Sequence, residues 1–153
     1  MPNVIEIARE DESDRFAIVV AEWNRSITDR LLDGALEVLG EAAVVDVAWV
    51  PGAWELPVAV QRLAQSQQYA AILALGAVIH GETSHDQHIN RGVSLALMKI
   101  ALSQDLPVLL GLLTCDSMEQ AIHRAGGNVG NKGSECAQAA LKMVGLLRNC
   151  PPG

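Results

Sequence analysis

The sequence predicts a three-layer α/β/α sandwich built around a four-stranded parallel sheet. Apolar runs typical of buried strands alternate along the chain with segments whose apolar residues recur at helical spacing. Such alternation favours right-handed β–α–β units and a sheet covered on both faces. Half of the 153 residues are hydrophobic and only 3% are aromatic, as expected for closely packed layers. The length and the short turns predict one domain over residues 1–153, with an N-terminal strand and turn over 1–14 and a short tail over 149–153.

The first half of the chain is expected to begin with a strand that stands apart from the core. Val4–Ile7 would form this strand, and the acidic turn Glu10–Asp14 follows it. No partner for it is evident within the chain, so it is available to join the sheet edge of a neighbouring subunit. The core elements expected next are a strand over Phe16–Ala21, an amphipathic helix over Ile27–Leu39 that stops at Gly40, a strand over Val44–Val50 and a helix over Glu55–Gln65 with Pro57 in its first turn.

The second half continues the same alternation. The longest apolar run, over Ala70–Ile79, is expected to form a buried strand, and a break at Gly81 separates it from a long helix over His85–Leu102. The remaining elements expected are a strand over Pro107–Leu113, a short helix over Ser117–Ala125, a Gly-rich turn over Gly126–Gly130 and a final helix over Lys132–Leu147.

Charge and composition exclude several classes of partner. The formal net charge is −7 and the lysines and arginines form no run, which argues against nucleic acid and anionic membrane surfaces. No apolar run approaches the ~20 residues that cross a bilayer, and the N-terminus lacks an apolar signal core. The three cysteines lack close metal-ligand spacing, as is typical of reduced thiols. We therefore expect a cytoplasmic protein.

Chemically unusual residues follow the C-terminal ends of all four core strands. Those ends lie at one edge of a parallel sheet, where a crevice and free helix N-termini favour ligand binding. The segments are therefore expected to line one pocket. They are Trp23-Asn24, then Pro51–Glu55, then His80–His85, and finally Thr114 with Glu119, His123 and Arg124 on the helix beyond.

Each candidate residue also has a purely structural interpretation. Trp23 and Trp54 suit stacking on a planar heterocycle, but equally a packed core or an oligomer interface. Glu55 and Thr83 suit ligand contacts, but also the first turn of a helix, as an acid that complements the dipole and as an N-cap. Arg124 suits a bound anion or a surface ion pair.

His85 is the strongest candidate for a general acid–base, because imidazole titrates near neutral pH. A surface or capping role is its alternative. His80, His85 and His88 with Asp86 suggest a metal site instead, since His85 and His88 are three residues apart and can share a helix face. The Gly turn separates His80 from that helix and no further ligand is obvious, so we expect no metal.

Several long motifs, in the order in which they occur, resemble those of the lumazine synthase family. The resemblance extends from about Phe16 to about Leu147 and implies a flavodoxin-like fold. The motifs are Trp23-Asn24 with Ile27-Thr28 and LLDGA at Leu31–Ala35, VPGAWELP at Val50–Pro57, LALGAVIHGETSH at Leu73–His85, LLGLLT at Leu109–Thr114 and EQAIHRAGGNVGNKGSECA at Glu119–Ala137.

The resemblance implies a transferase of the penultimate step of riboflavin biosynthesis. The family condenses two small molecules, 5-amino-6-(D-ribitylamino)uracil and 3,4-dihydroxy-2-butanone 4-phosphate. The products are 6,7-dimethyl-8-ribityllumazine, phosphate and water. The resemblance implies that no metal or organic cofactor is required.

The resemblance also implies roles for the matching positions. His85 would transfer protons, and Glu82, Thr83 and Arg124 would bind the phosphate of the butanone, with Lys132 adding positive charge nearby. The residues that would bind the ribitylaminouracil are Trp23, Ala53, Trp54, Glu55, Ala77, Val78, Ile79 and Leu110.

The chain departs from the family pattern at a few positions. Leu110 stands where the family usually has an aromatic residue that reaches into a neighbouring subunit's site, so only apolar contact remains there. His80 replaces a usual arginine, and the segment Asp86–Arg91 replaces an aromatic–acid–aromatic pattern.

The resemblance further implies a homo-oligomer. The family forms pentamers with active sites between neighbours, and the short turn Gly126–Asn131 favours closure into a shell of twelve pentamers. Riboflavin synthase is a further candidate partner. The alternatives are a non-catalytic flavin carrier, a cage-forming relative without activity, and a different phosphate-handling enzyme on a flavodoxin-like fold. The residue patterns by themselves do not separate these from the synthase.

Overall fold

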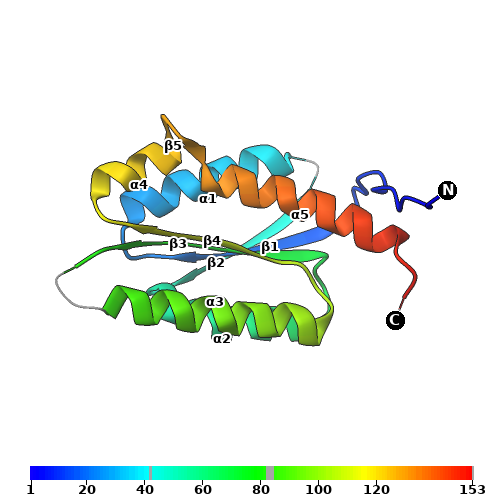
Figure 1. Ribbon diagram of the computed structural model, residues 1–153, viewed down its shortest axis with the longest axis horizontal. Coiled ribbons are helices and arrows are strands. Elements are labelled where there is room, and N and C mark those ends of the chain that lie inside the picture. The colour runs from blue at the N-terminus through cyan, green and yellow to red at the C-terminus, as the bar shows by residue number, and fades with distance from the viewer. Residues whose placement is uncertain (42, 82–84, 153) are drawn as a thin grey trace.

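A single four-stranded parallel sheet forms the centre of the molecule (Figure 1). The structure is a computed structural model that describes residues 1–41, 43–81 and 85–152. The strand order is β2-β1-β3-β4, so β2 and β4 are the edge strands. All three neighbouring pairs are parallel, which confirms the predicted sheet. The strands are β1 (Arg15–Ala21), β2 (Val44–Val50), β3 (Ala71–Ile79) and β4 (Val108–Cys115).

Helices cover both faces of this sheet and complete the predicted three-layer sandwich. In Figure 1, α1, α4 and α5 lie above the sheet, and α2 and α3 lie below it. A short 3-10 helix, η1 (Ala53–Glu55), precedes α2. The helices are α1 (Arg25–Leu39), α2 (Leu56–Gln65), α3 (His85–Gln104), α4 (Met118–Arg124) and α5 (Lys132–Asn149).

Successive residues of the central strands pack into two separate cores, one on each face of the sheet. In β1, Ile18 and Val20 pack against α1 and α5, whereas Ala17 and Val19 face α2 and α3. This follows from the two-residue period of a strand. Because both faces are covered, β1 and β3 read as continuous apolar runs.

The predicted boundaries agree with the structure except at a few ends. The Gly-rich turn expected over Gly126–Gly130 is instead a small antiparallel hairpin, formed by β5 (Ala125–Gly127) and β6 (Gly130–Asn131). Gly126 and Gly130 adopt positive φ angles, which glycine tolerates and which let the chain reverse tightly. The sequence alone could not distinguish a hairpin this short from a turn.

Val4–Ile7 forms no strand within the single chain, and its pairing with a neighbouring subunit stays a prediction. The segment is held on α5 instead. The Asn149 side-chain amide donates to the Glu6 carbonyl at 2.8 Å, and the Ala8 N–H donates to the Gly145 carbonyl at 3.0 Å. A strand needs a pairing edge, and these contacts offer individual hydrogen bonds rather than a ladder.

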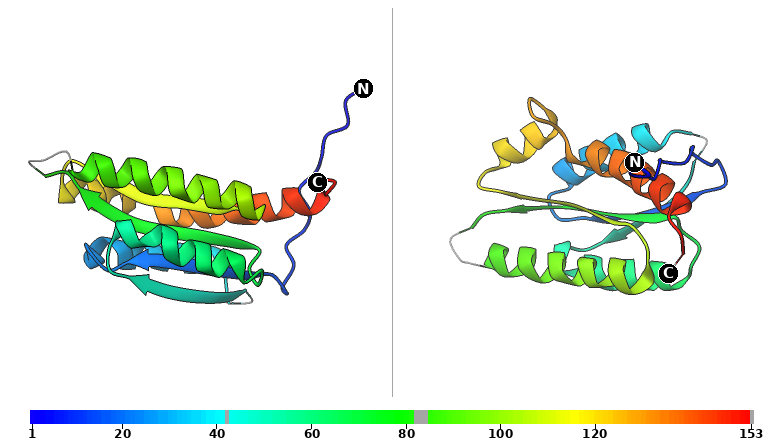
Figure 2. Two further views of the ribbon diagram at one scale, coloured as in Figure 1. Left: turned by 90° about the horizontal axis from the view of Figure 1, so that it is seen from below. Right: turned by 45° about the vertical axis from the view of Figure 1, so that its right-hand side comes forward.

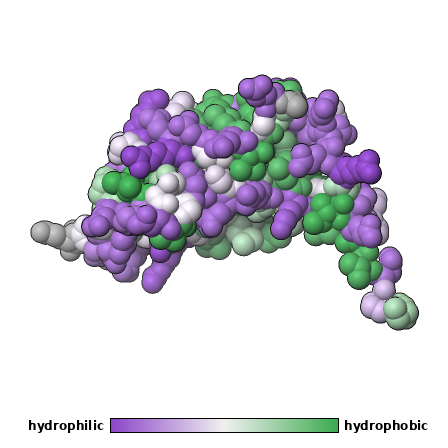
Figure 3. All heavy atoms as spheres, turned by 90° about the horizontal axis from the view of Figure 1, so that it is seen from above, coloured by the Kyte–Doolittle hydropathy of each residue, from purple (hydrophilic) through white to green (hydrophobic). Residues whose placement is uncertain are grey.

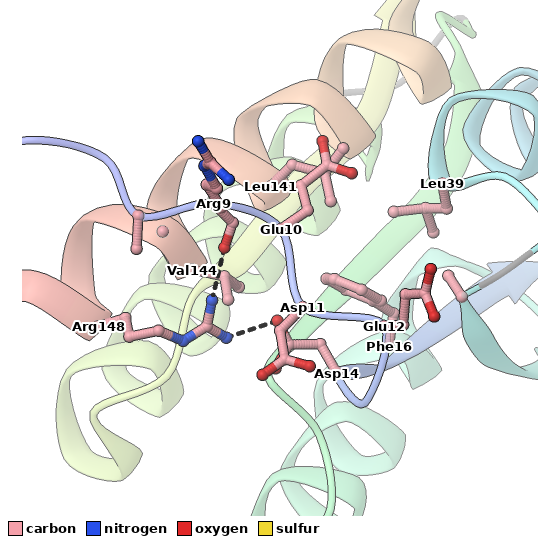
Figure 4. A pocket seen from close by; sticks show the side chains of 13 residues that line it. Arg9, Glu10, Asp11, Glu12, Asp14, Phe16, Leu39, Leu141, Val144 and Arg148 are labelled. Carbon is pink, nitrogen blue, oxygen red and sulfur yellow. Dashed lines mark hydrogen bonds and ion pairs between the residues drawn. The ribbon is translucent and has the colours of Figure 1, made fainter.

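Arg148 fixes the same segment at its junction with β1. Its guanidinium donates to the Arg9 carbonyl at 3.1 Å and to the Asp14 carboxylate at 2.5 Å, across the pocket shown in Figure 4. The N-terminal end of the chain, which precedes the residues of this pocket, extends away from the body of the molecule (Figure 2). Apolar surface marks this protruding end at the lower right of Figure 3, and Val4 and Ile7 are exposed there.

Helices α1 and α5 approach each other closely at Gly133. A Cβ atom at this position would lie 1.9 Å from the Leu31 carbonyl oxygen, so only glycine fits. Cys136, on the next turn of α5, is buried, and burial raises the pKa of its thiol to about 11. Cys115 is also buried, whereas Cys150 is partly accessible at the end of α5.

Candidate functional site

The carboxyl ends of the strands form a stepped edge that supports the candidate site. β3 and β4 end together, with Ile79 opposite Cys115. β1 and β2 also end together, with Ala21 opposite Val50, but they stop short of the end of β3. This step leaves the last residues of β3 uncovered by β1, and the segment after β1 folds into that space.

The Trp23 cavity occupies this step and has a volume of about 250 Å³. It brings together six of the predicted site residues from four separate segments. The described part of the wall is mainly apolar, with polar side chains at Asn24 and at the start of α3, a composition typical of a small-molecule pocket. Its lining residues are Trp23, Asn24, Ala53, Ala77, Val78, Ile79, Gly81, His85, Asp86 and Ile89.

Trp23 presents a large apolar surface beside this cavity. Its side chain is 64% exposed, so it is not a core residue. Its indole ring lies against Gly52, where a Cβ atom would come within 2.7 Å of the ring. Gly52 thus lets the ring lie flat on the β2–η1 turn. This geometry favours stacking on a planar ligand over the core alternative.

Asn24 links the two strands that form the step. It adopts the left-handed conformation, with φ of 62°, and its side-chain amide donates to the Ala77 carbonyl at 2.8 Å. Asparagine tolerates this conformation better than most residues. The bond fixes the end of β3 relative to the start of α1, and therefore fixes one wall of the cavity.

The Arg124 cavity lies at the same sheet edge and has a volume of about 450 Å³. Two cations, Arg124 at the end of α4 and Lys132 at the start of α5, line it with the acid Glu135. The Thr114 hydroxyl in this lining is buried and makes no hydrogen bond with the described residues. Two cations with an unused hydroxyl suit a small anion such as a phosphate group. The other lining residues are Asn90, Leu112, Leu113 and Val129.

The two cavities meet at the first turns of α3. Ile89 lines the Trp23 cavity, and the next residue, Asn90, lines the Arg124 cavity. The ends of β3 and β4, which are paired, contribute Val78 to the first cavity and Thr114 to the second. An apolar pocket and a cationic pocket therefore lie side by side, with His85 at the start of the helix between them.

The structure separates three other predicted site residues from these cavities. Trp54 and Glu55 line a different groove between α2 and α3, where the Trp54 ring lies over Gly92. Leu110 is 40% exposed on the edge strand β4 and lines neither cavity. The expected convergence of all four strand ends in one pocket is therefore only partial within a single chain. Glu82 and Thr83 lie outside the described residues.

His80, which follows β3, and Asp86, near the start of α3, form an ion pair. His80 Nδ1 lies 2.9 Å from Asp86 Oδ2. The hydrogen bond and charge of Asp86 raise the pKa of His80, and Asp116 adds to this effect. The hydrogen bond with His80 in turn lowers the pKa of Asp86, and the N–H groups of the first turn of α3 add to this.

Among the described residues, no group of three His, Cys, Asp or Glu side chains is placed to hold a metal ion. His80 is engaged with Asp86 instead. Of the helices in the described part of the chain, none combines the length and apolarity that a membrane crossing requires.

Several residues of the two cavities were not among the predicted site residues. Asn24 and Thr114 follow strand ends and were expected to line the pocket, but no role was predicted for either side chain. Asp86 was considered only as a metal ligand. Asn90 gave no signal, because its place in the lining depends on where α3 begins and how it rotates. Only the folded chain brings Asp86 to His80, six residues away.

Comparison with known proteins adds an independent finding to this geometry. The family model described as 6,7-dimethyl-8-ribityllumazine synthase matches residues 13–148. The match covers the four-stranded sheet, both cavities and all five α-helices. It stops one residue before the end of α5. The chain therefore belongs to the 6,7-dimethyl-8-ribityllumazine synthase family, whose enzymes act on small molecules in riboflavin biosynthesis.

Proposed function

We propose that this chain condenses 5-amino-6-(D-ribitylamino)uracil with 3,4-dihydroxy-2-butanone 4-phosphate. The products are 6,7-dimethyl-8-ribityllumazine, phosphate and water. Family membership supports this reaction, and two adjacent cavities of different chemistry suit its two substrates. That adjacency is the observation on which the proposal depends.

The ribitylaminouracil binds in the Trp23 cavity. The exposed Trp23 ring stacks on the flat pyrimidine, and the backbone of Ala77–Ile79 offers hydrogen-bonding groups to its edge. Ala53 closes the floor. Trp54 and Glu55 follow Ala53 directly, so a ribityl chain leaving this cavity past Ala53 reaches them.

The butanone phosphate binds in the Arg124 cavity. Arg124 and Lys132 balance the charge of the phosphate. Glu82 and Thr83, which precede α3 in the sequence, would add contacts to the phosphate. The same cations stabilise the phosphate as it leaves, because negative charge develops on it at that step.

His85 transfers protons between the two bound substrates. The amine of the pyrimidine attacks the ketone and water is lost to form an imine. Proton shifts then drive the loss of phosphate, and ring closure with a second dehydration gives the product. Each step needs a group that both accepts and donates protons near neutral pH, which suits an imidazole. The two adjacent cavities supply the remaining rate enhancement by holding the reactants together.

The complete site requires neighbouring subunits. Leu110 points away from both cavities on the edge strand β4 and contributes apolar contact to the site of a neighbour. A pentamer places such an edge against each site, and we propose that twelve pentamers close into a shell. The chain extends from the body only before Glu6, and Val4–Ile7 would pair with a neighbour's sheet in place of its contacts with α5. A shell would also be able to enclose riboflavin synthase, which would consume its product.

The direct test mixes the purified protein with both substrates and follows the absorbance and fluorescence of the lumazine. We expect product to form only when both substrates are present, with release of one phosphate per lumazine. A protein that binds flavin tightly but forms no lumazine would contradict the proposal and favour the carrier alternative. Release of phosphate without lumazine would favour a different phosphate-handling enzyme.

A further inference from the structure

The ion pair between His80 and Asp86 joins the end of a strand to the start of a helix. His80 directly follows β3, and Asp86 is the second residue of α3. The backbone N–H of His80 donates to the Cys115 carbonyl at 2.7 Å, so His80 is itself fixed to β4. Through the contact of 2.9 Å between His80 and Asp86, the first turn of α3 is tied to the sheet.

Burial makes Asp86 dependent on this partner. The Asp86 side chain is only 7% exposed, whereas that of His80 is 47% exposed. The second carboxylate oxygen, Asp86 Oδ1, is buried and makes no hydrogen bond with the described residues. A buried carboxylate that loses its one paired cation is strongly disfavoured. The first turn of α3 would then have to move, or Asp86 would have to take up a proton.

His85 is the chain neighbour of Asp86, and both line the Trp23 cavity. We infer that the His80–Asp86 pair is a clasp that positions His85 and the first turn of α3 for catalysis, with Asp86 as a positioning residue. The effect of the clasp on catalysis rests on the proposed function. The effect of the clasp on the position of α3 does not, and it can be measured without substrate.

The clasp is expected to depend on pH through His80. The charged groups that act on His80 are Asp86 from α3 and Asp116, which follows β4. Both raise the pKa of His80 above its usual 6.5, so its charged form is complete below 6.5 and is lost as the pH rises through the raised value. The pKa of Asp86 is lowered below 3.8, so its charge is lost only as the pH falls below that range. The ionic clasp therefore exists between the lowered pKa of Asp86 and the raised pKa of His80. Above the pKa of His80, a weaker hydrogen bond to the neutral imidazole replaces it.

Four variants separate the clasp from the general effect of removing a charge. Asp86→Asn and His80→Asn each remove the ionic pair. His80→Asn changes a side chain that is nearly half exposed, so it tests the clasp even if Asp86→Asn does not fold. His80→Arg keeps a cation that stays charged in alkali. His88→Asn removes an exposed histidine one turn along α3 and is the matched control.

The first measurement is hydrogen–deuterium exchange of the segment 80–92 in the assembled protein without substrate, between pH 6 and pH 9. A peptide from the middle of α5 serves as the reference, so that the general increase of exchange rate with pH is removed. Exchange in the wild type should rise as His80 loses its proton, and both asparagine variants should exchange about fivefold faster at pH 6. His80→Arg should stay protected at high pH. Equal exchange in the wild type and in both asparagine variants at pH 6 would overturn the clasp.

The second measurement is the pH profile of lumazine formation. Both asparagine variants should lower kcat about tenfold with little change in either KM, because misplacing His85 affects the chemical step. His80→Arg should restore kcat and carry activity to higher pH. If kcat falls at the same high pH in the wild type and in His80→Arg, the positioning role is overturned. A wild type that forms no lumazine would overturn the proposed function instead, and exchange alone would then decide on the clasp.

Discussion

At the scale of single residues, His85 and Arg124 line different cavities. Their removal should therefore affect different kinetic quantities. A proton-transfer group acts on the reacting atoms, whereas a cation that holds phosphate acts mainly on the binding of one substrate. The two variants below use this separation.

Replacing His85 with asparagine should lower kcat about 10²-fold and leave both KM values within about threefold, because it removes proton transfer but keeps the cavity walls. Steady-state lumazine formation measures this change. His88→Asn, on the same helix, should behave as the wild type. A His85→Asn protein with full turnover would show that another group moves the protons.

Replacing Arg124 with alanine should raise the KM for the butanone phosphate about tenfold to 100-fold, since one charge-assisted hydrogen bond is lost. The KM for the ribitylaminouracil should change little, because Trp23 lies in the other cavity. Titrating each substrate at a saturating level of the other measures both values. Arg62→Ala, on the exposed side of α2, is the control. Equal rises in both KM values would contradict the division between the cavities.

The residue scale also shows where prediction from sequence succeeds. The placement of Trp23 and His85 at one cavity could be predicted because both follow strand ends, while their roles stay predictions. The contacts of Asn24, Asp86 and Asn90 could not be predicted, since only the fold creates them. The groove that holds Trp54 and Glu55 was missed for a related reason. The 3-10 turn at Ala53–Glu55 directs these side chains towards α3, and residue order does not encode that direction.

At the scale of elements, the contact between α1 and α5 sets the position of the Arg124 cavity. Gly133 follows Lys132 directly, and its close approach to Leu31 fixes where α5 begins. Asn131 reinforces this contact, because its side chain donates to the Arg30 carbonyl at 3.0 Å and caps α5 at the Ser134 N–H. The position of Lys132 is thus a consequence of helix packing.

Replacing Gly133 with alanine should destabilise the fold by about 1–3 kcal/mol, because the new Cβ overlaps the Leu31 carbonyl and forces the two helices apart. Chemical denaturation followed by circular dichroism measures the change. Gln138→Ala, on the exposed face of α5, should leave stability within about 0.5 kcal/mol. A Gly133→Ala protein as stable as the wild type would show that the helices shift without cost.

Most elements could be predicted because hydrophobic periodicity reports burial directly. The apolar runs at Arg15–Ala21 and Ala71–Ile79 are almost wholly buried, and such runs fit few other structures. The short elements behave differently. The hairpin at Ala125–Asn131 depends on two glycines with positive φ, and the missing strand at Val4–Ile7 depends on a partner that one chain does not supply.

At the scale of the whole molecule, exposed apolar surface supports an assembly. Leu95, Met98 and Leu102 lie at helical spacing on α3 and are 59%, 59% and 75% exposed. Such a stripe is unusual on a surface that stays in water. It lies on the face of the sheet opposite α1 and α5 (Figure 1). We therefore expect the isolated chain to be an incomplete unit.

Light scattering after size-exclusion chromatography should give the mass of twelve pentamers, and no single-chain species should persist at working concentration. Replacing Leu102 with glutamate should shift the population towards smaller species, because a charge would have to be buried at the interface. Lys99→Glu changes charge on the same helix at an exposed position and is the control. A mass near that of five chains would exclude the shell under those conditions.

The unequal accessibility of the three thiols gives the chain a built-in attachment point for a probe. Cys115 and Cys136 are enclosed between the sheet and the α1–α5 layer, and the raised pKa of Cys136 leaves it almost wholly in its unreactive protonated form. A maleimide dye should therefore modify Cys150 alone, which intact-mass spectrometry would show as a single addition. Cys150 caps the C-terminal end of α5, and this end lies far from the start of α3 in Figures 1 and 2. A fluorophore there would report on association between subunits without entering either substrate pocket.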